Sequence, residues 1–324
     1  MVWLVSEIAQ VAIIALVAIL IVAMLSPFES LQWWAGWDDR WSGPAELPAL
    51  SVTPVDDQAN CYIVYLSGVG SMDPSTLNPK ESNFLDLLQE RLVGEVLLRD
   101  VFPYSVTNNP LTGRRRLGAF WRWAQRAVER FKNLVWLITT RNLFQVAVSA
   151  DRRYGPIYSF GIAREITLSL VRHGYRFGSG IPIVIIGLSG GGQIAVGCTP
   201  SLARILDARV WVVSIGGVLT DDPGILAVEH VYHLSGSKDA IQHVGARLYP
   251  GRWPIFKRSA WNRARAQGII SVIAVGPMKH MGQGDYFSRS ARLPDGRSHV
   301  EKTVDVVAAA IDQIRAQLAA VEQA

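Results

Sequence analysis

Hydrophobic residues in this chain gather in short apolar runs, separated by segments with helical periodicity. The first such run in the central part of the chain covers residues 61–66 and ends at Ser67-Gly68-Val69-Gly70. Its residues are β-branched, aromatic or aliphatic, which favours a buried strand. In residues 82–92 the apolar positions recur every three or four residues, which predicts a helix.

The same alternation continues to the end of the chain. Five further apolar runs predict strands, at residues 95–101, 181–186, 209–215, 229–234 and 269–275. Two further periodic segments predict helices, at residues 157–173 and 300–321. Continuous apolar strands separated by helices favour a mostly parallel central sheet with helices on both faces, so the predicted fold class is α/β.

Two segments interrupt the alternation and are predicted to be insertions in this scaffold. Residues 107–150 have one apolar helical face, and within 114–132 seven basic residues accompany a single acid. Residues 243–268 are rich in Trp and Arg, and within 247–265 six basic residues accompany no acid. Because the whole chain has a net charge of only +5, its basic character is concentrated in these two segments.

The N-terminus carries the longest apolar run. Residues 8–25 are interrupted only by Gln10 and approach the roughly 20 apolar residues that cross a bilayer. A secretory signal peptide would place Lys or Arg before this run, where Glu7 is the only charged residue. A buried core helix is the other alternative, but the run is apolar on all faces. We therefore predict a single-pass membrane anchor at residues 1–27.

A segment rich in Trp and Pro, residues 28–57, follows this predicted anchor. Its tryptophans are at positions 33, 34, 37 and 41. Indoles are enriched at the headgroup level of a bilayer, and prolines favour an extended linker. The remaining residues, 58–324, would form the folded domain. Basic segments downstream of the anchor favour the cytoplasmic side for this domain.

A candidate nucleophile follows the apolar run at 181–186. The sequence Gly187-Leu188-Ser189-Gly190-Gly191 has the G-x-S-x-G pattern and leads into a segment compatible with a helix. A serine on such a sharp turn has a strained backbone, so the residues two before and two after it must be small. Gly187 and Gly191 meet this requirement, which favours Ser189 as the nucleophile.

In this context the chain resembles the α/β-hydrolase superfamily of serine esterases and lipases. In that family an acid and then a histidine follow the nucleophile, each in a loop after a later strand. Asp239 follows the predicted strand 229–234, and His280 follows the predicted strand 269–275. The resemblance implies a catalytic triad of Ser189, Asp239 and His280, in which His280 takes the serine proton and Asp239 orients the imidazole.

The resemblance also implies an oxyanion hole of backbone N–H groups. One donor would be Gly190, directly after the nucleophile, and the other Val69, in the loop after the first strand. Where the family often has His-Gly in that loop, this chain has Ser67-Gly68, so the second donor is less well defined. The first insertion, 107–150, is where related enzymes carry a cap or lid.

Asp221 or Asp222, after the preceding strand, is the alternative acid. No cluster of residues has the spacing of metal ligands, and the Gly-rich turn lacks the Lys of a P-loop, so neither a metal nor a cofactor is expected. Structural roles are expected for the two cysteines, Cys61 and Cys198, and for the histidines at positions 173, 230, 233 and 299.

Together these features predict a serine hydrolase that cleaves an ester or thioester of a lipophilic acyl group through an acyl-Ser189 intermediate. An acyltransferase using the same triad, or a catalytically silent hydrolase fold that binds or assembles at the membrane, are the alternatives. The expected partners are the acyl substrate and membrane lipids, including an anionic surface for the basic first insertion. No nucleic-acid module is recognisable, and the pattern indicates no oligomeric state.

Overall fold

The computed structural model describes residues 2–35, 59–73, 77–108 and 135–322. Its strands are β1 Cys61–Leu66, β2 Glu95–Leu98, β3 Ile183–Leu188, β4 Val210–Ile215, β5 Val231–Gly236 and β6 Ile270–Gly276. Its α-helices are α1 Val2–Trp34, α2 Pro79–Gln89, α4 Val135–Ala150, α5 Gly155–Arg172, α6 Gly190–Leu206, α7 Ala240–Leu248, α8 Ala260–Ala266 and α9 His299–Glu322. Two short 3₁₀ helices are η2 Pro223–Ala227 and η3 Pro250–Arg252.

The strands form one sheet in the order β2-β1-β3-β4-β5-β6. Every neighbouring pair is parallel. The chain passes from β1 outward to β2 and then returns to β3 on the other side of β1, so the strand order reverses between β1 and β3. In parallel α/β sheets, ligands bind beyond the carboxyl ends of the strands at such a switch point. The predicted α/β class with a parallel sheet is therefore confirmed.

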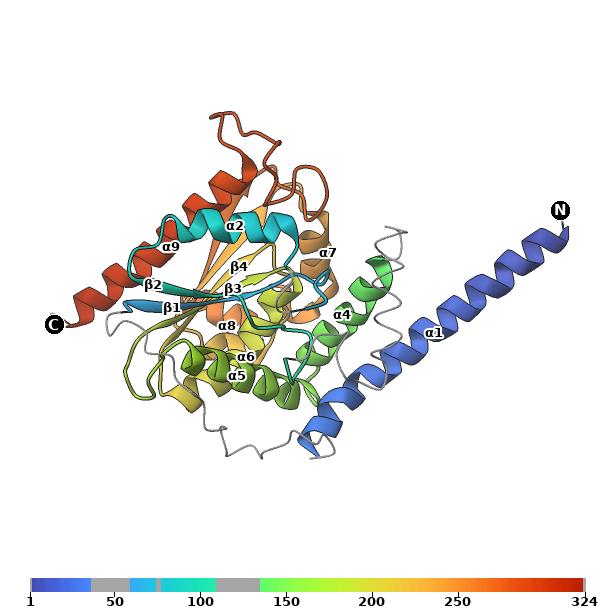
Figure 1. Ribbon diagram of the computed structural model, residues 1–324, viewed down its shortest axis with the longest axis horizontal. Helices are drawn as coiled ribbons and strands as arrows, with labels where there is room; N and C mark the ends of the chain where they lie inside the picture. Colours follow the sequence, from blue (N-terminus) through green and yellow to red (C-terminus); the bar gives the residue numbers. More distant parts are fainter. Residues whose placement is uncertain (1, 36–58, 74–76, 109–134, 323–324) are drawn as a thin grey trace.

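Alternate residues of the strands enter two different cores, one on each face of the sheet. On one face, Tyr62, Val64 and Leu66 of β1 pack with buried residues of α4, α5 and α6. On the other face, Ile63 and Tyr65 pack with buried residues of α2 and α9. Figure 1 shows these two helical layers enclosing the sheet. Because both faces are covered, the strands are apolar at almost every position, as the sequence pattern predicted.

Helix α1 extends well away from the domain (Figure 1). Its C-terminal end packs on the domain, and α1 contacts α4 and α5. There Trp33 is 5% exposed and its ring lies 6.1 Å from that of Phe160. This burial differs from the headgroup position that the sequence predicted for the indole. The helix continues to Trp34, into the predicted linker at 28–57, of which residues 36–57 lie outside the described residues.

The structure leaves the membrane anchor a prediction. Within the part of the chain that it describes, none of the helices combines the length and the hydropathy needed to cross a membrane. Several side chains of α1 that it does describe are apolar and exposed: Val11, Ile13, Ile14, Leu16, Val17, Ile21 and Leu25.

Helix caps and local turns explain where the observed elements differ from their predicted limits. Helix α2 begins at Pro79, before the predicted residue 82, because the Asn78 side chain accepts a hydrogen bond from Lys80 N at 3.0 Å. Strand β2 ends at Leu98, whereas the apolar pattern continued to residue 101. Asn108 holds the following segment as a turn, because its side chain bonds Phe102 N at 2.6 Å.

Both predicted insertions are helical where they are described. Helix α4 occupies 135–150 of the first insertion, and residues 109–134 lie outside the described residues. The second insertion contains the end of α7, then η3 and α8. Helix α4 packs on α6, the helix that follows the candidate nucleophile. The first insertion therefore borders the turn that carries Ser189.

Candidate active site

Ser189 is the single residue between β3 and α6, and its backbone is strained. Its φ is 52°, a left-handed value that non-glycine residues rarely adopt. A Cβ atom at Gly187 would lie 2.5 Å from Gly192 N, and one at Gly191 would lie 2.5 Å from Leu66 O. Neither position has room for a side chain. The sharp turn therefore requires both glycines, for the reason that the sequence pattern suggested.

The structure brings Ser189, His280 and Asp239 into one hydrogen-bonded row. Ser189 Oγ lies 2.8 Å from His280 Nε2. His280 Nδ1 lies 3.0 Å from both carboxylate oxygens of Asp239. Asp239 follows β5 and His280 follows β6, so both side chains come from loops at the carboxyl edge of the sheet. The side chain of Asp239 is fully buried, and that of His280 is 10% exposed.

Asp239 is held from two further directions. Its Oδ1 accepts a hydrogen bond from Gln242 N at 2.9 Å, and its Oδ2 accepts one from Tyr286 OH at 2.8 Å. Burial acts to raise the pKa of Asp239, but the hydrogen bonds from His280, Gln242 and Tyr286 outweigh it and leave that pKa below its ordinary value. Asp239 is therefore a carboxylate at neutral pH, as a group that orients a histidine must be.

Tyr286 is a site residue that the sequence did not indicate. Its ring is buried, and its hydroxyl accepts a hydrogen bond from Gly236 N at 2.9 Å while donating to Asp239. Burial and the neighbouring carboxylate raise the pKa of Tyr286, so the phenol keeps its proton and remains a donor. It lies in the irregular stretch between β6 and α9, where no periodicity or motif marks it.

The two residues predicted to supply the oxyanion donors, Gly190 and Val69, lie close together. Gly190 is the first residue of α6, where backbone N–H groups and the helix dipole favour negative charge. A Cβ atom at Gly190 would lie 2.9 Å from a methyl carbon of Val69. Asn142 of α4 fixes the Val69 loop, because its Nδ2 donates to Val69 O at 2.9 Å and to Ser71 O at 2.7 Å. Their role as donors to a substrate stays a prediction.

A buried carboxyl group supports the same loop from the other face of the sheet. Glu81 of α2 accepts a hydrogen bond from Tyr65 OH at 2.8 Å and another from the backbone N–H of Gly68. Burial raises the pKa of Glu81 to about 7, although both hydrogen bonds act to lower it. Glu81 therefore exchanges its proton near neutral pH, directly beside the predicted oxyanion loop.

This raised pKa gives folding stability a specific pH dependence. Between the ordinary pKa of 4.5 and about 7, folded Glu81 holds its proton while the unfolded chain loses it, so the stabilisation falls as pH rises through this window. Glu81→Gln should remove this loss, and the stability of the variant relative to wild type should rise by up to about 3 kcal/mol across the window. Urea unfolding of the full chain at several pH values measures this. Glu90→Gln, at the exposed C-terminal end of the same helix, is the control and should track wild type; a parallel course for Glu81→Gln would contradict the prediction.

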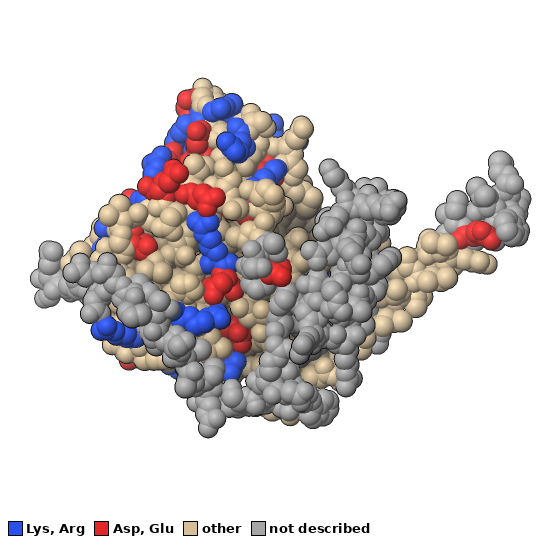
Figure 2. All heavy atoms as spheres, viewed as in Figure 1, with Lys and Arg blue, Asp and Glu red and all other residues tan. Residues whose placement is uncertain are grey.

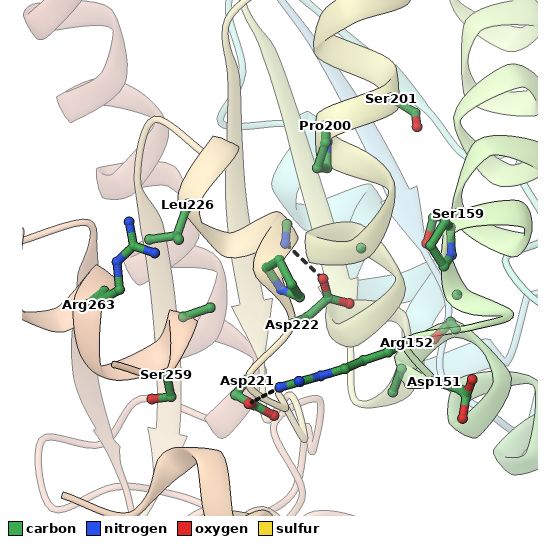
Figure 3. A pocket seen from close by; sticks show the side chains of 18 of the residues that line it. Asp151, Arg152, Ser159, Pro200, Ser201, Asp221, Asp222, Leu226, Ser259 and Arg263 are labelled. Atoms are coloured by element: carbon green, nitrogen blue, oxygen red, sulfur yellow. Dashed lines mark hydrogen bonds and ion pairs between the residues drawn. The ribbon is translucent and has the colours of Figure 1, made fainter. Parts of the chain in front are cut away.

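The alternative acids lie elsewhere, at a hollow of about 580 Å³ between α5, α6, η2 and α8. Figure 3 shows Arg152 reaching across this hollow to Asp221, with an N–O distance of 3.3 Å. Asp222 accepts hydrogen bonds from Gln193 Nε2 at 3.0 Å and from Gly224 N at 2.8 Å. Neither carboxylate is bonded to His280, so Asp239 is the acid that the structure places beside the histidine.

The remaining predicted structural residues have contacts of their own. His233 is buried between Ser214 Oγ and Gln242 Nε2, each 3.1 Å from a ring nitrogen. Burial lowers the pKa of His233 to about 3, so it is neutral. His173 caps the end of α5, where its Nδ1 lies 2.9 Å from Ser169 O. Other histidine contacts are His230 Nε2 to Ser271 Oγ at 2.8 Å and His299 Nδ1 to Gly284 O at 3.1 Å. Cys61 and Cys198 are both buried free thiols.

No protein-family model and no curated protein sequence matches this chain. Among the residues that the structure describes, no group of three His, Cys, Asp or Glu side chains is placed to hold a metal ion. The arrangement of Ser189, His280 and Asp239 is therefore the feature of the molecule that bears most directly on its function.

Proposed function

We propose that the protein is a serine hydrolase of the α/β-hydrolase fold that cleaves an ester or thioester of a lipophilic acyl group. One observation carries the proposal: Ser189 Oγ lies 2.8 Å from His280 Nε2, while His280 Nδ1 lies 3.0 Å from the buried carboxylate of Asp239. A serine on a strained turn, a histidine and an ionised acid in this order are the requirements for nucleophilic acyl transfer.

The geometry supports a two-step reaction. In the first step, Ser189 Oγ attacks the substrate carbonyl carbon and His280 Nε2 takes the hydroxyl proton. His280 then gives this proton to the departing alcohol or thiol, which leaves an acyl-Ser189 ester. In the second step, a water molecule loses a proton to His280 and attacks the ester, and the proton returns to Ser189 as the carboxylic acid departs. Asp239 stabilises the imidazolium in both steps.

The negative charge that develops on the carbonyl oxygen needs nearby donors. The N–H of Gly190 at the start of α6 and that of Val69 are the proposed donors. Removing one preorganised oxyanion donor costs roughly 3–4 kcal/mol in related acyl transfer. The hydrogen bonds from Asn142 and to Glu81 hold the Val69 loop in place before substrate arrives. The loop therefore does not have to rearrange during the reaction.

The distribution of charge supports a membrane setting and hence a lipophilic substrate. In Figure 2, side chains of both charge signs alternate over α2 and α9, whereas the projecting part of α1 is almost uncharged. The exposed apolar side chains of α1 are unfavourable in water, and a bilayer would bury them. We propose that α1 anchors the protein to a membrane as a single pass, with the catalytic domain on the cytoplasmic side.

Labelling with a fluorophosphonate probe tests the chemistry directly. The wild-type chain should form a stable adduct, and peptide mass analysis should place it on Ser189. Ser189→Ala should not be labelled, because the probe needs an activated hydroxyl. A fold that serves only as a binding or assembly subunit would leave the wild type unlabelled, which would reject the hydrolase. For labelled protein, an acyl ester assayed with and without an alcohol acceptor then separates hydrolysis from acyl transfer.

A further inference from the structure

Helix α7 packs on the domain through its polar and small residues. A Cβ atom at Gly245 would lie 2.3 Å from a methyl carbon of Val218, so the glycine lets the helix approach closely. The Gln242 side chain donates to Leu234 O at 3.1 Å and accepts from Ser235 Oγ at 2.7 Å. The buried face of a surface helix is normally apolar. In α7 this face instead makes hydrogen bonds through Gln242 and close contact through Gly245.

The apolar side chains of α7 point to the solvent instead. Ile241 is 41% exposed, Val244 is 48% exposed and Leu248 is 70% exposed. Their spacing of three and four residues puts them in one stripe along the helix. An amphipathic helix with its apolar stripe outward exposes surface that water solvates poorly, and contiguous surface of this kind marks an interaction site.

The turn that follows α7 adds to this surface. Trp253 is 41% exposed, Ile255 is 75% exposed and Phe256 is 45% exposed. Asn262 fixes the turn, because its Nδ2 donates to Trp253 O at 2.8 Å and to Phe256 O at 3.1 Å. Trp253 Nε1 also donates to Arg247 O at 2.8 Å, which ties the turn to α7. The exposed side chains therefore belong to an ordered surface.

The charge of this surface indicates the chemistry of its partner. Residues 240–265 contain six Lys or Arg residues and no acid. Arg247, Lys257 and Arg258 are exposed beside the apolar side chains. Apolar residues combined with cations are the features by which peripheral helices bind anionic lipid, through burial below the headgroups and attraction to their charge.

We propose that residues 241–258, here named the α7 surface, dock on a membrane that contains anionic lipid. In Figure 1, α7 lies at the side of the domain toward which α1 projects, with α4 between them. The helix begins directly after Asp239, so docking would bring the catalytic edge of the sheet to the lipid that carries the substrate. The inference rests on the membrane setting of the proposed function and does not depend on whether hydrolysis occurs.

An environment-sensitive fluorophore on Val244→Cys tests the docking. The native cysteines are buried and leave the introduced thiol as the reactive one. The matched control is Val93→Cys, a 74% exposed valine in the loop between α2 and β2. The full chain is reconstituted in vesicles of phosphatidylcholine, with or without phosphatidylglycerol. With the anionic lipid, the label at 244 should shift to the blue and become protected from iodide, while the label at 93 should not change.

The charge contribution is tested by Lys257→Gln and Arg258→Gln in the Val244→Cys chain. Each substitution should lower the ratio of docked to undocked label about fivefold, and added salt should act in the same direction. An unchanged label at 244 in anionic vesicles would overturn the proposal, as would equal protection in both lipids. Protection without lipid that grows with protein concentration would assign the α7 surface to a second copy of the chain. Fluorophosphonate labelling of the same samples reports separately on the catalytic proposal.

Discussion

Ser189→Ala should lower kcat for an acyl ester about 10⁶-fold, to a level set by binding and oxyanion stabilisation alone. The loss is large because no other hydroxyl among the described residues is hydrogen-bonded to His280. Steady-state hydrolysis of a chromogenic acyl ester by the full chain measures it. Because alanine differs from serine only by the lost hydroxyl group, the variant should unfold at the same urea concentration as wild type.

Ser290→Ala is the matched control for this substitution. Ser290 is exposed, and its Oγ makes only a long contact of 3.5 Å with Ser288 Oγ. It should hydrolyse the ester at the wild-type rate. If Ser189→Ala kept more than a small fraction of the wild-type rate, the acyl-Ser189 mechanism would be wrong.

Asp239→Asn should lower kcat about 10⁴-fold with little effect on folding. An amide at this position can donate to His280 Nδ1, which favours the imidazole tautomer whose Nε2 carries the proton and cannot accept that of Ser189. Asp222→Asn distinguishes this role from a general effect of removing a buried acid. Asp222 lies at the hollow of Figure 3 and is bonded to Gln193 and Gly224, so its variant should hydrolyse the ester almost normally.

The pH dependence of the residual activity completes this comparison. The Asp239→Asn rate should recover only at high pH, where hydroxide replaces the histidine as the base. Equal losses in both variants would show that the histidine does not depend on Asp239. A larger loss of kcat in Asp222→Asn than in Asp239→Asn would identify Asp222, in the loop after β4, as the acid of the triad.

Much of this architecture could be predicted because its signals are local. A strand covered on both faces must be apolar almost throughout, so β1 was delimited correctly and β3, β4, β5 and β6 to within two residues. The nucleophile turn was recognisable because Gly187 and Gly191 lie within two residues of Ser189, at positions where the turn has no room for a side chain. Asp239 and His280 were predicted because the family resemblance implies an acid and then a histidine in loops after later strands, and parallel strands bring their carboxyl ends to one edge.

The features that could not be predicted depend on contacts between distant parts of the chain. Tyr286 supports Asp239 from 47 positions away, in a stretch without periodicity. Glu81 looks like an ordinary helix residue until the sheet buries it beside Tyr65. Trp33 was interpreted from its neighbours as a headgroup residue, but its burial depends on α4 and α5, whose packing no local pattern records.

The burial of Trp33 in the domain limits how far the domain can lie from the membrane. If residues 8–25 span the bilayer, the helix between residue 25 and Trp33 is a spacer of about 12 Å, at about 1.5 Å for each residue. The headgroup layer alone occupies roughly 5–8 Å on each side of the hydrocarbon. The catalytic domain would then stand at a fixed height just above the lipid, within reach of an acyl chain lifted only partly out of it.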